Sequence, residues 1–248
     1  MIKFFRKIRY DLMEKNKTGK YLKYAIGEIL LVVIGILIAL SINNWNENRK
    51  TYEKERMYLS SLKRDFNETK RELTRVTNKT ESVKKITNLL LSLQGNPMDT
   101  LDNAIVDSLI MRSRGYTIFM TSEATIKDLI SSGNLNLISN DTLRGLLAAW
   151  EADLKPIRGW EEHSKNSVFV LSSMLNEIGD NYNYRNNNRP LFSDSMRDKV
   201  LSDLKFRNTF DELNRYSTFL NNLYKEKSFV IDTIVQIIDR DYKRLNND

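Results

Sequence analysis

The strongest pattern in the chain is an unbroken apolar run from Ile29 to Leu40. A helix over the nineteen residues 24–42 would be roughly 28 Å long, at about 1.5 Å per residue, which is close to the ~30 Å hydrocarbon core of a bilayer. Its backbone groups would pair within the helix, as a lipid environment requires. Tyr21 and Tyr24 before the run and Trp45 after it are side chains typical of the two headgroup layers. The pattern predicts a transmembrane helix.

Charge predicts the orientation of this helix. Residues 1–24 hold eight basic and two acidic side chains, whereas the rest of the chain holds 31 basic and 30 acidic ones. The positive-inside rule then places the N-terminus in the cytoplasm and the bulk of the chain across the membrane. Because the excess charge is confined to this end, the net charge of +7 indicates topology and attraction to anionic lipid, and argues against a nucleic-acid partner.

A cleaved signal peptide is the alternative interpretation of the same segment. Ala39-Leu40-Ser41 is an acceptable small-x-small cleavage site. The long basic region before the run, the acidic Glu28 at its edge and the length of the run all favour an anchor that is not cleaved.

Small residues within the predicted span suggest contact between helices. Gly27, Gly35 and Ala39 are separated by multiples of four residues, the spacing that lets two membrane helices approach closely. Glu28 lies beside this stripe. It either pairs with a lysine near the cytoplasmic headgroups or hydrogen-bonds across a helix–helix interface. We interpret these four residues as an oligomerisation site.

The long segment after the span has a coiled-coil-like pattern. Between Glu47 and Leu93 charged residues fill most positions outside the inward-facing ones, and no proline or glycine interrupts the segment. The inward positions alternate three and four residues apart, as in an a/d seam, and the threonines among them favour packing within a bundle of helices. These seam positions are Leu59, Leu62, Phe66, Thr69, Leu73, Val76, Thr80, Val83, Thr87 and Leu90.

Glycines, prolines and apolar periodicity divide the rest of the chain into further helices. We predict them over residues 100–112, 122–132, 141–178 and 205–244. Ser122 and Asp141 are interpreted as N-caps, and Pro156 as a kink. The asparagine-rich residues 179–194 are interpreted as a surface loop, after which Ser193 or Asp194 begins a short helix.

The final predicted helix again shows a three/four alternation of inward positions. These are Leu213, Tyr216, Leu220, Leu223, Lys227, Val230, Ile234 and Ile237. Because this helix matches the first long helix in length, we expect the two to run antiparallel.

Candidate chemistry is sparse. The absence of cysteine excludes disulfides, thiol nucleophiles and thiolate metal sites. The single histidine, His163, stands beside Glu161 and Glu162 and is interpreted as a solvated side chain on a helix surface. Trp150 and Trp160 are interpreted as core residues in preference to a ligand cage. No phosphate-binding loop or nucleophile elbow occurs, so we predict no catalytic, cofactor or metal site.

Two parts of the sequence resemble a known family. The string GEILLVVIGILIALSINNWNE, from Gly27 to Glu47, and the ISSGNLNLI of residues 130–138, followed by Leu143-Arg144 and Trp150, resemble the flavobacterial family called domain of unknown function 6090. The resemblance implies an inner-membrane protein of Bacteroidota with a periplasmic helical domain. It implies no active-site residues, because the function of the family is not known.

Five Asp-Ser or Asp-Thr pairs precede an apolar residue, an acceptor pattern for O-glycosylation of exported proteins in that phylum. They begin at Asp99, Asp107, Asp141, Asp194 and Asp232. The same pattern occurs at helix N-caps, and we interpret most of the five as caps.

The sequence therefore predicts an all-α protein with three parts. Residues 1–23 form a basic amphipathic cytoplasmic segment, residues 24–45 a single transmembrane helix, and residues 46–248 an extended, coiled-coil-like periplasmic bundle. The expected function is that of a self-associating scaffold without catalysis or a cofactor, whose partners are the bilayer, further copies or other envelope proteins. The alternative is a periplasmic sensor or a regulatory subunit of a larger inner-membrane complex.

Overall fold

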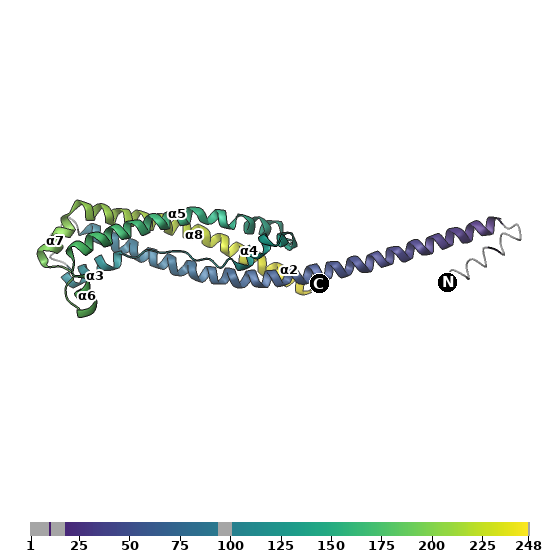
Figure 1. Ribbon diagram of the computed structural model, residues 1–248, viewed down its shortest axis with the longest axis horizontal. Helices are drawn as coiled ribbons and strands as arrows, with labels where there is room; N and C mark the ends of the chain where they lie inside the picture. The colour runs from purple at the N-terminus through teal and green to yellow at the C-terminus, as the bar shows by residue number, and fades with distance from the viewer. Residues whose placement is uncertain (1–9, 11–17, 94–100, 248) are drawn as a thin grey trace. The chain divides into compact units, whose positions relative to one another are not determined.

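The fold is all-α in the part of the chain that the computed structural model describes, which comprises residues 10, 18–93 and 101–247. These residues form seven α-helices, one short 3-10 helix and no strand (Figure 1). The elements are α2 (Thr18–Ser92), α3 (Asn103–Ser113), α4 (Ala124–Ser131), η1 (Asn134–Leu137), α5 (Asp141–Ile178), α6 (Asn181–Asn187), α7 (Asp194–Ser202) and α8 (Leu204–Asn247). Most of the predicted amphipathic segment 1–23, and the Asp99 motif, lie outside the described residues.

The chain divides into two compact units, Met1–Glu55 and Arg56–Asp248, and α2 contributes residues to both. In the first unit every side chain from Ile29 to Leu40 is exposed. Within the described residues this is the one helix whose length and apolar composition would let it cross a membrane, properties that a signal sequence shares.

The second unit is built around the predicted seam of α2. All ten predicted seam residues are buried, each at most 3% exposed, which confirms the prediction of an inward face. Thr80 and Thr87 tolerate burial because their hydroxyl groups donate to carbonyl oxygens one turn earlier in the same helix, those of Val76 (2.8 Å) and Val83 (2.9 Å).

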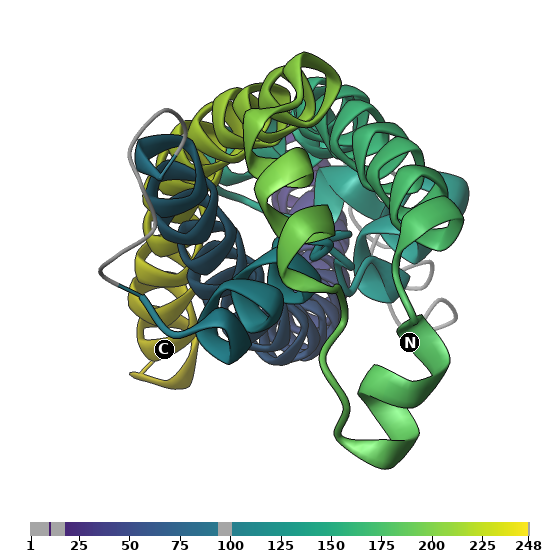
Figure 2. The same cartoon turned by 90° about the vertical axis from the view of Figure 1, so that its left-hand side faces the viewer.

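The predicted antiparallel pairing of the two long helices is confirmed within this unit. As residue numbers rise along α2, those of its partners on α8 fall in step, and Figure 2 views the helices of the unit end-on. The pairs are Lys63 with Asp239 (2.7 Å), Lys70 with Asp232 (2.5 Å), Glu81 with Asn221 (2.8 Å) and Asn88 with Asn214 (2.8 Å).

A cross-linking experiment tests this register in a chain that has no native cysteine. We expect Lys70→Cys combined with Asp232→Cys to be joined by a short bismaleimide, because these side chains meet across the helix pair. Both are well exposed, so losing their ion pair should cost no more than about 1 kcal/mol. Lys63→Cys with Asp232→Cys, two helical turns out of register, is the control. Equal yields from the two pairs would contradict the alignment.

The predicted seam of α8 is correct at four of its eight positions. Leu213, Leu220, Lys227 and Ile234 are buried. The other four are displaced by one residue, because the buried side chains are those of Ser217, Tyr224, Ile231 and Ile238, whereas Tyr216, Leu223, Val230 and Ile237 are only partly buried.

Two predicted N-caps are wrong. The N-cap of α5 is Asn140, whose side chain accepts the Leu143 N–H (3.0 Å), and Asp141 lies in the first turn. The N-cap of α4 is Glu123, without a capping side-chain hydrogen bond. Ser122 lies one residue before this cap, and its N–H donates to the Thr69 hydroxyl of α2 (3.0 Å), which ties the chain before α4 to the bundle. The prediction for α7 is confirmed, since Ser193 is its N-cap.

Residues 179–194 are not simply a surface loop. They include α6, and Leu191 and Phe192 behind it are buried. Gly179 allows Leu191 and Phe192 to pack against the end of α5, because a Cβ at this position would lie 3.0 Å from the Leu175 carbonyl oxygen and 3.1 Å from the Phe192 ring. The apolar pair Leu191-Phe192 supplies the energy that holds the segment against the bundle.

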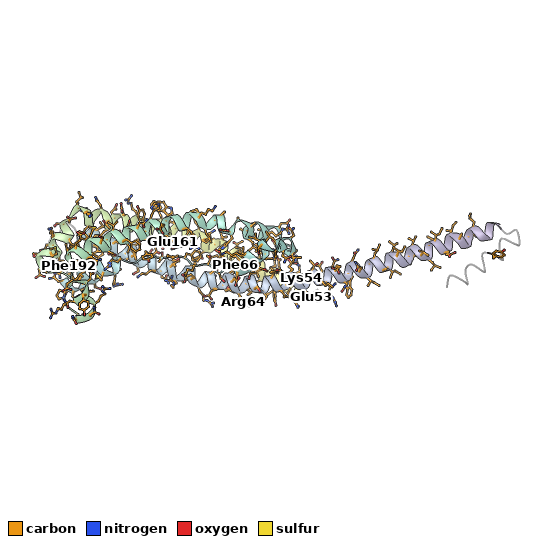
Figure 3. All side chains as sticks on the ribbon, in the orientation of Figure 1. Glu53, Lys54, Arg64, Phe66, Glu161 and Phe192 are labelled. Carbon is orange, nitrogen blue, oxygen red and sulfur yellow. The ribbon has the colours of Figure 1, made fainter. Side chains whose placement is uncertain are left out.

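The core of the second unit consists of two apolar clusters. One includes Leu59, Phe66 and Trp150, and the other includes Leu90, Val168 and Phe192. Figure 3 shows Glu161 between Phe66 of the first cluster and Phe192 of the second. α5 also continues through Pro156 without ending there.

Candidate functional site

A layer of buried polar side chains separates the two apolar clusters. α2 contributes Thr80, α5 contributes Glu161 and Ser164, and α8 contributes Ser217, each at most 4% exposed. These residues occupy inward positions of the three long helices, and buried apolar residues flank them on each helix: Val76 and Val83 on α2, Ile157 and Val168 on α5, and Leu213 and Leu220 on α8. We define them, together with Thr117, as the polar layer.

Thr117 reaches the polar layer from an extended segment, residues 115–123, that connects α3 to α4. Its side chains alternate as in a β-strand: Thr117 and Phe119 are buried, whereas Tyr116, Ile118 and Met120 are exposed. The segment also approaches α2 closely, because a Cβ on Gly115 would lie 2.7 Å from Lys79. This segment was not predicted from the sequence.

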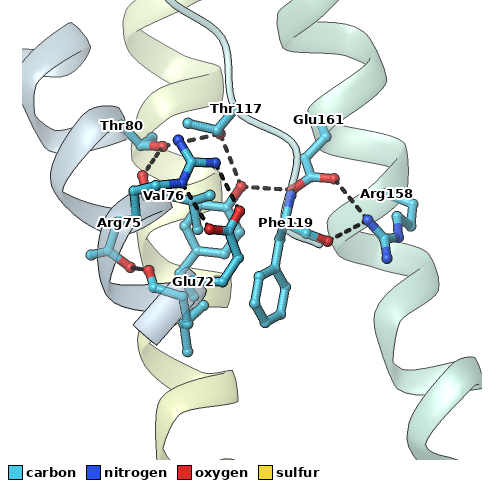
Figure 4. A network of polar contacts seen from close by, with 11 residues as sticks. Glu72, Arg75, Val76, Thr80, Thr117, Phe119, Arg158 and Glu161 are labelled. Carbon is cyan, nitrogen blue, oxygen red and sulfur yellow. Dashed lines mark hydrogen bonds and ion pairs between the residues drawn. The ribbon is translucent and has the colours of Figure 1, made fainter. Parts of the chain in front are cut away.

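The Glu161 carboxylate ties three elements together (Figure 4). Its Oε1 accepts the backbone N–H of Phe119 (2.6 Å) and the hydroxyl of Tyr224 on α8 (2.8 Å). The Tyr224 hydroxyl has one hydrogen, which it donates in the hydrogen bond to Glu161. In the 3.0 Å contact between Tyr224 and Thr117, the donor must therefore be the Thr117 hydroxyl. Thr80 lies 3.3 Å from Thr117 and donates to its own helix. Donors therefore converge on one carboxylate oxygen.

Arg158 completes the attachment of the extended segment. Its Nη1 donates to the Phe119 carbonyl oxygen (2.5 Å) and lies 3.6 Å from Oε2 of Glu161. Both backbone polar groups of Phe119 are thus bound by side chains of α5, one turn apart, while its ring packs in the core. α5 holds the segment at the point where it crosses the polar layer.

Burial perturbs the titration of both acidic groups in this network. Desolvation raises the pKa of Glu161, and the hydrogen bonds from Tyr224 and Phe119 lower it only in part. Desolvation also raises the pKa of Tyr224, and the neighbouring Glu161 carboxylate raises it further. Tyr224 therefore stays protonated and serves as a donor.

This arrangement is suited to positioning chain segments. A carboxylate that accepts two buried donors fixes the relative places of α5, α8 and the extended segment, and it penalises any arrangement that leaves the donors unpaired. The hydroxyl groups of Thr80, Thr117 and Tyr224 are bound to one another, to a backbone carbonyl oxygen of α2 and to the Glu161 carboxylate.

A second buried ionic contact holds the far end of the unit. Arg197 of α7 is 1% exposed and pairs with the fully buried Asp107 of α3 (Nε to Oδ1, 2.8 Å). Asp107 also accepts the Leu191 N–H (2.8 Å), and Arg197 donates to the Phe192 carbonyl oxygen (3.1 Å) and to the exposed Asp194 (2.8 Å). The contact joins α3, α7 and the apolar pair before α7.

The structure does not test the predicted oligomerisation site. Gly27 and Glu28 are half-buried, and Glu28 has an interaction partner, whereas Gly35 and Ala39 are exposed. A Cβ added to Gly27 or Gly35 would meet nothing within 4 Å in the single chain, so space for an approaching helix is present.

The predicted interface anchors are described only in part. Tyr21 and Tyr24 lie in α2, but their side chains are outside what the structure describes. Trp45 is exposed, and the Arg49 guanidinium lies 5.6 Å above its ring. A cation over an aromatic ring at this position is compatible with a headgroup layer.

The two bundle tryptophans have different environments. Trp150 is a core residue, as predicted, and meets Phe66 edge-on with 5.0 Å between ring centroids. Trp160 is half-buried and stacks on Phe219 (4.7 Å). His163 is exposed, as predicted, with its ring 5.6 Å from that of Trp160.

The interpretation of most Asp-Ser and Asp-Thr pairs as N-caps is wrong for the described ones. Asp107 lies inside α3 and Asp232 inside α8, while Asp141 and Asp194 are the first helical residues after other caps. Asp107 is instead the buried partner of Arg197, which explains an aspartate in the middle of a helix.

Comparison with known proteins identifies a family. The model described as "Family of unknown function (DUF6090)" matches residues 28–151, half of the chain. The chain belongs to the DUF6090 family. No curated protein and no solved structure matches it.

The DUF6090 match covers only part of the candidate site. Thr80, Thr117 and Asp107 lie inside the matched residues, whereas Glu161, Arg197 and Tyr224 lie beyond them. The match includes the whole apolar run and ends within α5, so the polar layer is assembled from residues on both sides of the boundary at residue 151.

Proposed function

We propose that this DUF6090 protein is a self-associating, membrane-anchored scaffold. The observation that carries the proposal is the exposed run Ile29–Leu40, which belongs to the same helix that forms the seam of the bundle core. Exposing an unbroken apolar run of twelve residues to water is unfavourable, and a bilayer removes that cost. The bundle in Arg56–Asp248 buries its own core and so does not need the run for its stability.

The proposal includes a location and a topology. The basic residues before the run favour a cytoplasmic N-terminus, so the bundle would lie on the opposite side of a bacterial inner membrane. The resemblance to a flavobacterial family supports a periplasmic bundle. Gly27, Gly35 and Ala39 offer a close-approach surface for a second anchor, with Glu28 as a polar contact.

A substitution in the middle of the run tests the anchor. We expect Ile34→Arg to raise the share of protein that alkaline carbonate extracts from membranes, because arginine at mid-bilayer costs ~2.5–3.5 kcal/mol on insertion scales. Asn48→Arg, beyond the run, is the matched control and should remain membrane-bound. If the two variants were extracted alike, the run would not be an anchor.

Topology and processing require a separate measurement. A cysteine replacing Lys225 should react with a membrane-impermeant maleimide in intact spheroplasts, and a tag at the N-terminus should remain on the full-length chain in immunoblots. A mature protein that begins near Ser41, or a bundle that reacts only after lysis, would contradict the proposal.

A specific observation favours sensing as the second candidate function. The polar layer divides the core of the bundle into two apolar clusters, and the second cluster borders an open hollow. A hollow of about 170 Å³ between α5, α7 and α8 offers space for a small ligand, with Met174, Met196 and Phe206 among its apolar lining and Lys199 and Lys205 among its charged lining. Co-purification with a stoichiometric partner that has a cytoplasmic domain would favour this function over a scaffold.

A further inference from the structure

The outward face of the extended segment forms an apolar strip. Tyr116, Ile118 and Met120 are 39%, 43% and 70% exposed, and Phe169 of α5, 53% exposed, extends the strip through an edge-on contact with Tyr116 (6.1 Å). We call these four residues the strip. Tyrosine, phenylalanine and methionine are enriched in protein interfaces, and contiguous exposed apolar patches mark interaction sites.

The segment is held firmly enough to serve as an interface. Its buried side chains Thr117 and Phe119 are fixed in the polar layer and in the core, and Glu161 and Arg158 bind both backbone groups of Phe119. The exposed side chains between these anchors are therefore presented in a defined order, and little conformational entropy would be lost on binding.

Charges of both signs border the strip. Arg158 and Lys165 of α5 lie along one side, with the Lys165 ammonium 5.7 Å from the Phe169 ring, and Glu162 pairs with Lys165 (3.2 Å). On the side of α2, Arg75 pairs with Glu72 (2.7 Å). An apolar centre with a rim of mixed charge can be complementary to a rotated copy of itself. A rim of one sign would instead have indicated an oppositely charged partner.

We propose that the strip is the contact between the bundles of two copies of this chain. The inference rests on the proposed function, since copies anchored by the same segment in one membrane present the same residues at the same height. In a twofold-symmetric pair, residues near the axis meet their own counterparts. Ile118, in the middle of the strip, would then face Ile118 of the second copy.

A single introduced cysteine tests this contact in the full-length chain in isolated membranes. Because the chain has no native cysteine, Ile118→Cys provides the only thiol. We expect copper-phenanthroline oxidation to give a disulfide-linked dimer in several-fold higher yield than for Phe229→Cys, the matched control on α8 that is 75% exposed. Circular dichroism of both variants checks that the bundle is intact.

Two further measurements separate this inference from the proposed function. Ile118→Asp should lower the dimer fraction of the detergent-solubilised full chain in mass photometry, whereas Phe229→Asp should not. A dimeric wild-type chain without preferential cross-linking at residue 118 would overturn the strip as the interface and leave self-association standing. A monomeric wild-type chain that is still membrane-bound would overturn both self-association and the strip.

Discussion

Asp107→Ala is expected to lower the free energy of unfolding of the bundle by about 3–5 kcal/mol. The substitution removes two contacts to Arg197 and the acceptor for the Leu191 N–H. It leaves a guanidinium group that is 1% exposed without its buried counter-charge. Urea titration of the detergent-solubilised chain, followed by tryptophan fluorescence, measures the change, because Trp150 lies in the core.

The same arginine provides a matched control. Asp194 also pairs with Arg197 but is 84% exposed, so Asp194→Ala should change the free energy of unfolding by no more than about 1 kcal/mol. Combining Asp107→Ala with Arg197→Met should recover part of the loss, because no unpaired charge then remains buried. If Asp107→Ala and Asp194→Ala had equal effects, the buried pair would not be what holds α3 to α7.

Replacing Glu161 should change how bundle stability depends on pH. Burial raises its pKa in the folded state above the ordinary value of 4.5. The folded protein then favours the protonated form, so the stability that Glu161 contributes is fully present below about pH 4.5 and is lost as the pH rises through the folded-state pKa. We expect Glu161→Gln to abolish this loss, so that the variant gains stability relative to wild type as the pH increases. Urea titrations at several pH values measure the difference, and an unchanged pH dependence would contradict the assignment.

Removing the Glu161 acceptor altogether should lower the free energy of unfolding, in contrast to Glu161→Gln. Glu161→Ala leaves the buried Phe119 N–H and Tyr224 hydroxyl without their acceptor, at roughly 1–3 kcal/mol for each group. Thr80→Val is the control in the same layer and should have a smaller effect, because the Thr80 hydroxyl donates within its own helix. We expect the free energy of unfolding of Glu161→Ala to be lower than that of wild type, and that of Glu161→Gln to equal or exceed it. This order would show that Glu161 stabilises the bundle as a hydrogen-bond acceptor and not through its charge.

The long helices were predictable because each carries a clear apolar periodicity. The seam of α2 alternates apolar residues and threonines with charged residues, which leaves one choice of inward face. On α8 the choice is ambiguous, because Leu223 and Tyr224, or Val230 and Ile231, are neighbours of similar apolarity. Packing decides between them: Tyr224 turns inward because its hydroxyl reaches Glu161, and the small Ser217 turns inward as part of the polar layer.

Part of the candidate site was also visible in the sequence. The inward positions of α5 at Ile157 and Val168 leave Glu161 and Ser164 between them at the same spacing, so a buried glutamate could have been predicted. Its partners could not. Phe119 and Tyr224 are 42 and 63 residues away, and only the folded arrangement of α5, α8 and the extended segment brings them together.

Helices with a seven-residue repeat can slide past each other by one repeat and still bury apolar side chains. In this bundle such a slip would place Ile231 or Ser217 where Tyr224 now stands, and the carboxyl group of Glu161 would lose its phenolic donor. Apolar side chains alone would permit helix registers that differ by one repeat. The buried Glu161 disfavours those registers, because each would leave its carboxyl group without the tyrosine donor.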